Sequence, residues 1–177
     1  MRHFTPGWVI RSLSITSLWL AMLHQPALAQ AKVVQTPYQN PKALLDIYLD
    51  DPAKLGSALY WLRSLVNPLT DAPYSMFPED IKVVVVMHGT EIVALAKKNL
   101  LQYEELVQRM RFYVDMGVKF KVCGLALQDY QYTPVDLHSF VEVVPSAITE
   151  LMHWQNQGYA LITPQVQVKK FSIESIR

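Results

Sequence analysis

The sequence predicts an α/β fold in which helices cover both faces of a parallel β-sheet. Two observations lead to this prediction. Segments typical of strands and of helices alternate along most of the chain, as they do in βαβ units. In addition, residues 81–87 are almost all apolar and β-branched, which is the pattern of a strand that is buried on both faces of a parallel sheet.

Each element follows from its local pattern. Apolar or alternating runs predict five strands, over residues 43–49, 81–87, 118–127, 140–144 and 159–162. The first helix is expected to begin at Asp51, a good N-cap before a proline, and to end at Asn67, which also precedes a proline. Apolar residues at helical spacing predict three more helices, over residues 90–96 with Thr90 as the cap, 106–114 and 146–157.

The last of these helices contains a tryptophan whose position the pattern also predicts. We expect its apolar face to carry Ile148, Leu151, Met152 and Gln155 and to pack on the sheet. Trp154 would then point away from that face, because two residues correspond to roughly 200° around a helix. The pattern leaves two interpretations open: Trp154 contributes to a contact between subunits, or the C-terminal tail of the same subunit covers it.

The N-terminus has the layout of an export signal. Arg2 and Arg11 flank a short positive region, residues 13–23 are mostly apolar, and residues 26–29 supply a small-x-small cleavage pattern. The apolar stretch is too short for a membrane-spanning helix, which needs about 20 residues. We therefore predict a cleaved signal peptide at residues 1–29, a periplasmic or secreted location, and no membrane association after cleavage.

The rest of the chain divides into three parts. Residues 30–41 are polar and rich in proline and are expected to form a flexible lead-in, while residues 42–164 hold the alternating strands and helices of the domain. The tail, residues 165–177, alternates apolar and polar residues and is expected to form an edge strand or an arm that docks on another subunit.

Composition excludes several classes of function. The 177 residues are 51% hydrophobic and 18% charged, with a net charge of +1 and no basic cluster, so we expect no nucleic-acid partner. No phosphate-binding glycine loop and no Gly-x-Ser-x-Gly motif is present. His138 and His153 do not form a metal-ligand spacing with Cys123, so we expect no metal and no cofactor.

Candidate site residues follow three of the predicted strands. Asp50 and Asp51 end the first strand, His88 ends the second, and Cys123, the only cysteine, lies near the end of the third. Because ligands bind beyond the carboxyl ends of parallel strands, these residues are expected at one edge of the sheet. Each also has a purely structural interpretation: Cys123 as a small buried hydrophobe, His88 as the partner of a loop carbonyl, and Asp51 as a helix cap.

Four segments resemble one known family in their order and spacing. They are VVVVMHG at residues 83–89, GVKFKVCG at 117–124, VEVVPS at 141–146 and QGYALITP at 157–164. Together they are similar to the DsrE/DsrF-like family. The resemblance implies a three-layer α/β/α fold with a five-stranded, mainly parallel sheet, and a homo-oligomer that is a trimer or a hexamer.

The resemblance also implies a role for the cysteine. Cytoplasmic relatives pass sulfur along a relay as a cysteine persulfide, and Cys123 matches their sulfur-carrying cysteine. The first hypothesis is therefore a persulfide or thiol carrier, sulfurtransferase-like at most, in which His88 is the neighbouring base and separate proteins donate and accept the sulfur. The second hypothesis is a non-catalytic oligomeric binding module. In that module a crevice at the strand ends holds a small ligand, and Cys123 is buried and inert.

Overall fold

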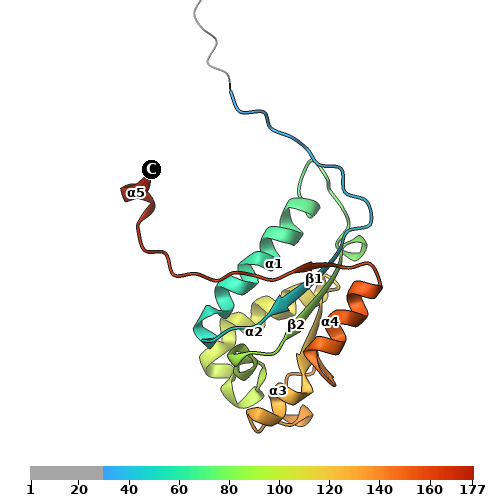
Figure 1. Ribbon diagram of the computed structural model, residues 1–177, viewed down its shortest axis with the longest axis vertical. Coiled ribbons are helices and arrows are strands. Elements are labelled where there is room, and N and C mark those ends of the chain that lie inside the picture. Colours follow the sequence, from blue (N-terminus) through green and yellow to red (C-terminus); the bar gives the residue numbers. More distant parts are fainter. Residues whose placement is uncertain (1–29) are drawn as a thin grey trace, which may run out of the picture. The chain divides into compact units, whose positions relative to one another are not determined.

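Five parallel strands form the centre of the computed structural model, which describes residues 30–177 (Figure 1). The strands lie in the order β4-β3-β2-β1-β5, and all four neighbouring pairs are parallel. Their bounds are β1 Lys42–Ile47, β2 Lys82–Met87, β3 Lys119–Cys123, β4 Val141–Val144 and β5 Ala160–Ile162. All of them belong to one compact unit, residues 37–177. The predicted α/β fold with a five-stranded parallel sheet is confirmed.

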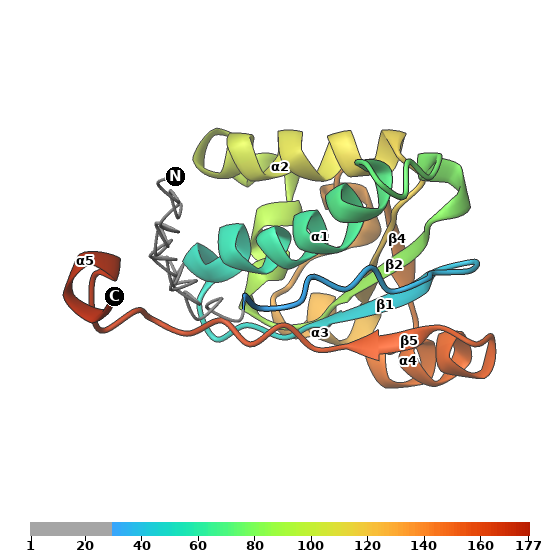
Figure 2. The ribbon, with the colours of Figure 1, turned by 90° about the horizontal axis from the view of Figure 1, so that it is seen from above.

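Helices cover both faces of this sheet and give the predicted three layers. Figure 2 shows α1 (Leu55–Thr70) and α2 (Leu100–Asp115) on one face and α4 (Ala147–Asn156) on the other. The two short helices are α3 (Gly124–Asp129), which follows β3 directly, and α5 (Ile173–Ile176), which lies in the tail. Crossovers between parallel strands are right-handed, so the direction in which the chain crosses the sheet decides which face the connecting helix covers. The chain runs in one direction from β1 to β4 and in the opposite direction from β4 to β5, which places helices on both faces.

The core lies between the central strands and the helices. In β2 every residue after Lys82 is buried, as predicted for a strand covered on both faces. The face of α1 that packs on the sheet shows the expected spacing of three and four residues; it consists of Leu55, Ala58, Leu59, Leu62, Val66 and Leu69.

Two predicted helix boundaries are wrong. Helix α1 continues through Pro68 to Thr70, because a proline in the last turn removes a single hydrogen bond and the amide of Asp71 still closes the helix on the Asn67 carbonyl at 2.8 Å. Residues 90–95 form a 3₁₀ segment that Thr90 does not cap. The Thr90 hydroxyl instead donates to the Leu49 carbonyl at 2.9 Å and joins this segment to the loop after β1.

Strand β3 is shorter than predicted. It ends at Cys123, and the chain turns into α3 at Gly124 instead of continuing to residue 127. A Cβ atom at Gly124 would lie 3.0 Å from the Val144 carbonyl oxygen, so the glycine lets this turn pass close to the end of β4.

The predicted orientation of α4 is also wrong. Leu151 is buried, but Ile148 and Met152 are 68% and 58% exposed. Trp154 turns inward: its indole N–H donates to Glu150 at 2.7 Å, and its ring lies 4.8 Å from that of Tyr159. The helix therefore packs on the face that contains Leu151 and Trp154, and Trp154 contacts Glu150 and Tyr159.

The remaining predictions concern the two ends of the chain. The predicted signal peptide, residues 1–29, lies outside the described residues. Residues 30–40 form no helix or strand and are exposed. The tail pairs with no strand, so the predicted edge strand is wrong, and only residues 173–176 are helical. Within residues 30–177, the structure has no helix with the length and apolar character needed to cross a bilayer.

Candidate functional site

The ends of β2 and β3 bring the two predicted site residues to neighbouring positions. Met87 of β2 is paired with Val122 of β3, and the next residue along each strand is His88 or Cys123. His88 immediately follows β2, and its amide donates to the carbonyl of Ile47 at 3.1 Å. The register thus brings the two residues to adjacent backbone positions at the carboxyl edge, where parallel sheets bind ligands.

His88 is held by side chains of the neighbouring strand and loop. Its Nε2 atom lies 2.8 Å from Oδ1 of Asp46, and its ring lies 4.9 Å from that of Tyr48 with a tilt of 31°. A carboxylate can only accept a hydrogen bond, so this pairing places the ring proton on Nε2 and leaves the lone pair on Nδ1. His88 therefore has the arrangement of a base that a carboxylate orients.

A buried carboxylate fixes the backbone around His88. Glu91 is fully buried, and its Oε1 accepts hydrogen bonds from the amides of His88 at 2.9 Å and Gly89 at 2.8 Å. Its Oε2 accepts a third from the amide of Leu49 at 3.0 Å. Burial raises the pKa of Glu91 above its ordinary value, and the backbone donors act in the opposite direction with a smaller effect. Glu91 thus joins the loop after β1 to the loop after β2.

Gly89 is needed at this junction because no side chain fits there. A Cβ atom on Gly89 would lie 2.5 Å from both the amide nitrogen and the carbonyl oxygen of Leu49, and 2.6 Å from Oε2 of Glu91. Backbone atoms cannot move aside cheaply, so the two loops approach this closely only with glycine at position 89.

Cys123 has a different environment. It is a free cysteine, 6% exposed, and belongs to the hydrophobic core. Side chains alternate along a strand, so Cys123 points to the same face of the sheet as Lys121, the face that α4 covers. In the part of the chain that the structure describes, the ring of His88 bonds to Asp46 and not to the thiol.

An ion-pair network surrounds the residue two positions before Cys123. The Nζ atom of Lys121 lies 2.6 Å from Oε2 of Glu142 and 3.2 Å from Oε1 of Glu150. Burial alone would lower the pKa of Lys121, but the hydrogen bonds and charges of the two glutamates outweigh it and raise that pKa. Since Glu142 lies on β4 and Glu150 on α4, Lys121 links three elements around the cysteine strand.

A crevice of about 460 Å³ opens beside His88. The ends of β1 and β2 and the segment after β5 form its walls, with Asp46, Tyr48, His88, Lys54 and Thr163 among the lining residues. Strand β5 lies on the opposite side of β1 from β2, so the crevice is at the point where the strand order reverses. Such points are the usual ligand sites of open α/β sheets. Cys123 does not line this crevice.

Of the two other predicted candidates, Asp50 also lines this crevice, whereas Asp51 does not. Asp51 caps the first turn, because its Oδ1 accepts a hydrogen bond from the amide of Ala53 at 2.8 Å. Asp50 pairs with Lys54 at 2.7 Å and is largely exposed. Within residues 30–177, no three side chains of the metal-ligating types lie together.

Sequence reasoning missed Asp46, Tyr48 and Glu91. Asp46 lies within an apolar run that predicts a strand. Because β1 has a neighbouring strand on each side, a charged residue in it needs a polar partner, and this need was a signal of a site. Glu91 offered a weaker signal, a charged residue directly before the buried Ile92. Its three amide partners come from two loops, which sequence periodicity cannot bring together.

These features define a class of protein: a three-layer α/β protein with a carboxylate–imidazole pair at the carboxyl edge of its sheet and a buried thiol on the next strand. The model of the DsrE/DsrF-like family matches residues 42–164, and the chain belongs to this family.

Comparison with solved structures agrees on the fold. The structure of a protein of unknown function, MTH1491 from Methanobacterium thermoautotrophicum, matches with a TM-score of 0.52 and 21% sequence identity. The match covers 70% of this chain and 99% of that chain. No curated protein matches the chain.

Proposed function

We propose that this protein is a sulfur carrier that holds a sulfane sulfur on Cys123 as a persulfide. The observation that carries this proposal is the position of Cys123 at the end of β3, on the strand next to the one that His88 follows. Membership of the DsrE/DsrF-like family supports it, because that membership suggests a role in sulfur relay.

The transfer step balances without an added oxidant or reductant. The Cys123 sulfur attacks the outer sulfur of a donor persulfide, R–S–SH. A new S–S bond forms on Cys123 as the donor S–S bond breaks, and the donor leaves as a thiolate that takes up the proton lost by Cys123. A thiol of the acceptor then removes the sulfur by the same exchange and restores the Cys123 thiol.

His88 is proposed as the group that receives the Cys123 proton before the attack. The pairing with Asp46 leaves the lone pair on Nδ1, and the Glu91 contacts fix the backbone at this position. Low exposure of Cys123 shields the bound sulfur from water and favours small sulfur donors over bulky ones.

Mass spectrometry of the native protein tests the proposal. After incubation with a small persulfide donor, we expect the mass to rise by one sulfur atom and to return to its original value on treatment with a thiol. Cys123→Ser is the matched control, because no other cysteine is present. If neither the persulfide donor nor a small alkylating reagent modifies Cys123 until denaturant is added, the carrier role is wrong.

A separate measurement, the rate of Cys123 alkylation, tests the role of His88. We expect His88→Gln to lower the rate of Cys123 alkylation roughly 10-fold near neutral pH, and to change the shape of its pH profile. His153→Gln, a change at an exposed histidine on α4, is the control and should leave both unchanged. Equal rates in the two variants would remove His88 from the mechanism.

A second candidate function has a specific observation in its favour. The crevice of about 460 Å³ is lined by His88, Asp46 and Tyr48 but excludes the buried Cys123. A binding module would hold a small ligand there and leave the thiol inert. Ligand binding that Cys123→Ser leaves intact and His88→Gln abolishes, together with an unreactive thiol, would favour this function.

The proposal also includes export of the protein and its assembly into an oligomer. Residues 1–29 support a cleaved signal peptide and a periplasmic or secreted location, and members of this family are often oligomeric. We therefore propose a homo-oligomer, a trimer or a hexamer, with separate donor and acceptor proteins. The exposed Ile148 and Met152 of α4 replace Trp154 as the expected interface residues.

N-terminal sequencing of the protein from the exporting cell tests the cleavage, with a mature start at Gln30 as the expected result.

A further inference from the structure

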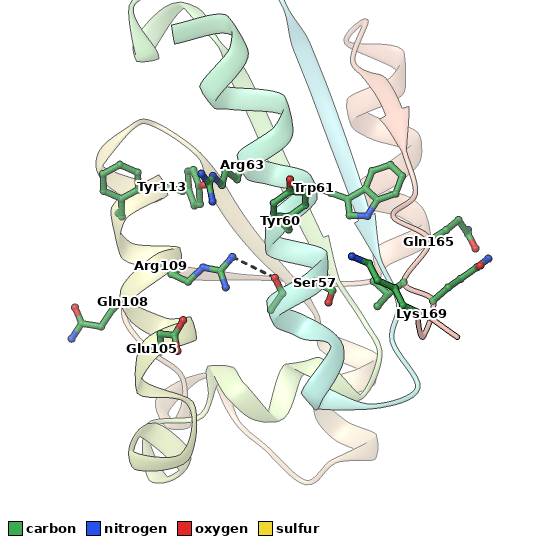
Figure 3. Close-up of a pocket in the computed structure, with 14 residues that line it drawn as sticks. Ser57, Tyr60, Trp61, Arg63, Glu105, Gln108, Arg109, Tyr113, Gln165 and Lys169 are labelled. Atoms are coloured by element: carbon green, nitrogen blue, oxygen red, sulfur yellow. Dashed lines mark hydrogen bonds between the residues drawn. The ribbon is translucent and has the colours of Figure 1, made fainter. Parts of the chain in front are cut away.

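The face of the molecule opposite to α4 contains a second and larger depression. It has a volume of about 980 Å³ and lies over α1, between α2 on one side and residues 165–169 of the tail on the other (Figure 3). This volume is at the upper end of the range of small-molecule sites, roughly 300–1,000 Å³. We call this depression the α1 trough. It shares neither His88 nor Cys123 with the carboxyl edge.

Three aromatic side chains in the α1 trough are exposed. Tyr60 and Trp61 of α1 are 59% and 41% exposed, and Phe112 of α2 is 59% exposed. Large aromatic side chains gathered at one hollow of the surface are typical of a binding site, since covering them with a ligand is favourable. Their flat faces suit a planar, apolar group.

The α1 trough also carries an excess of positive charge. Its lining includes Arg63, Arg109 and Lys169 but a single carboxylate, Glu105. Among the described residues, none of these four side chains forms a salt bridge. The cations are therefore available to an external anion, and guanidinium groups bind phosphate, sulfonate and carboxylate with paired hydrogen bonds.

Both guanidinium groups line the α1 trough, on the side of α2. Arg109 is anchored through Nη2 to the Gly56 carbonyl at 3.3 Å, and the Arg63 guanidinium lies 5.9 Å from the centre of the Tyr60 ring. Both positive charges act on the buried phenol of Tyr113: burial raises its pKa, and Arg109 and Arg63 oppose that rise. Figure 3 shows Arg63, Arg109 and Tyr60 on the α2 side of α1, with Trp61 and Lys169 on the tail side.

We propose that the α1 trough is a binding site for a small organic anion that carries a planar apolar ring. The anionic group binds Arg63 and Arg109, and the ring packs on the exposed aromatic side chains. This site is separate from the proposed sulfur carrier, so each can fail without the other.

Calorimetric titration of the full chain with 1-naphthyl phosphate tests the proposal. We expect saturable binding that weakens with added salt, and weaker binding of both inorganic phosphate and neutral 1-naphthol, which each supply half of the recognised chemistry. Arg109→Gln and Phe112→Ala should each weaken binding of 1-naphthyl phosphate roughly 10-fold or more.

Control variants outside the α1 trough test whether the loss of binding is specific to that site. Arg111→Gln removes a cation of the same helix that lies over Phe140 instead, and Tyr130→Ala removes an exposed aromatic ring elsewhere; both should bind as the wild type does. Cys123→Ser should also bind normally, which separates this site from the carrier role. Circular dichroism establishes that each variant is folded.

Three outcomes would overturn the inference. They are the absence of saturable binding, equal losses in the control variants, and binding by the dissociated monomer but not by the oligomer. The last would assign the α1 trough to a contact between subunits.

Discussion

The ends of β2 and β3 are neighbours, yet they are stabilised in opposite ways. His88, at the end of β2, has polar partners on every side: Asp46 through its ring and Glu91 through its backbone. Cys123, at the end of β3, is buried as a member of the hydrophobic core and forms no disulfide. A base must be oriented, whereas a sulfur carrier must be shielded from solvent, so the contrast matches the two roles proposed for these residues.

The strongest test of this contrast is the close approach at Gly89. We expect Gly89→Ala to lower the free energy of unfolding by roughly 3 kcal/mol, because the new Cβ would collide with backbone atoms of Leu49. Urea denaturation measures the change. Gly56→Ala is the control: its Cβ would meet only the side chains of Leu106 and Arg109 on α2, at ordinary contact distances, so stability should stay the same or rise by about 0.5 kcal/mol.

Removing the charge of Glu91 tests whether hydrogen bonding orients the β2 end. In Glu91→Gln the side-chain NH₂ group replaces one of the two oxygens that accept backbone N–H groups, so at least one buried donor loses its acceptor. We expect this to lower the free energy of unfolding by about 2 kcal/mol. Hydrogen exchange at the amides of Leu49, His88 and Gly89 should become faster, while exchange in β3 should not change. Uniform acceleration across the sheet would contradict a local role.

Lys121→Met tests whether the β3 end depends on its ion-pair network. The change leaves Glu150 without its cationic partner, and we expect the free energy of unfolding to fall by about 1 kcal/mol. The loss stays small because Glu142 is partly exposed and can be solvated by water instead. Alkylation of Cys123 should become faster as α4 loosens over the strand. Lys119→Met, at an exposed position of the same strand, is the control. Unchanged alkylation would show that apolar packing alone shields the thiol.

The smallest expected effect is a pH dependence of the free energy of unfolding, caused by Glu91 at the β2 end. In the unfolded chain the carboxyl of Glu91 ionises near its ordinary value of 4.5, whereas its raised pKa keeps it protonated to a higher pH in the folded chain. Between those two values the folded chain holds the proton that the unfolded chain has lost, so stability falls as the pH rises through this window. Denaturation of the wild type and of Glu91→Gln across this range measures the effect: the difference in stability between the two proteins should change with pH in the direction expected for Glu91, while the other carboxyl groups contribute equally to both.

Much of the fold could be predicted from the sequence because it depends on local pattern. Apart from Lys82, residues 81–87 are all apolar, which is the pattern of a strand inside a parallel sheet. The error in α4 has a physical cause. Ile148 and Met152 are four residues apart, and so are Ala147 and Leu151, so the spacing alone allows either pair to face the core.

The site was less predictable because its contacts join distant parts of the chain. His88 and Cys123 were chosen for their positions at strand ends, and the structure places His88 directly after β2 and Cys123 as the last residue of β3; their roles stay predictions. Lys121 looked like an outward-facing residue, since its burial depends on Glu142 and Glu150 from two later elements. Glu91 contacts the loop after β1, and no pattern within either segment reveals that contact.

The pairing of β5 with β1 has a consequence for how the chain folds. Ala160 pairs with Ala43, so the first strand of the sheet gains its second neighbour only when the last strand is available. Contacts this distant in sequence slow folding, because the loop between them must close first. We therefore expect the emerging polypeptide to remain without its complete sheet until synthesis has passed Ile162.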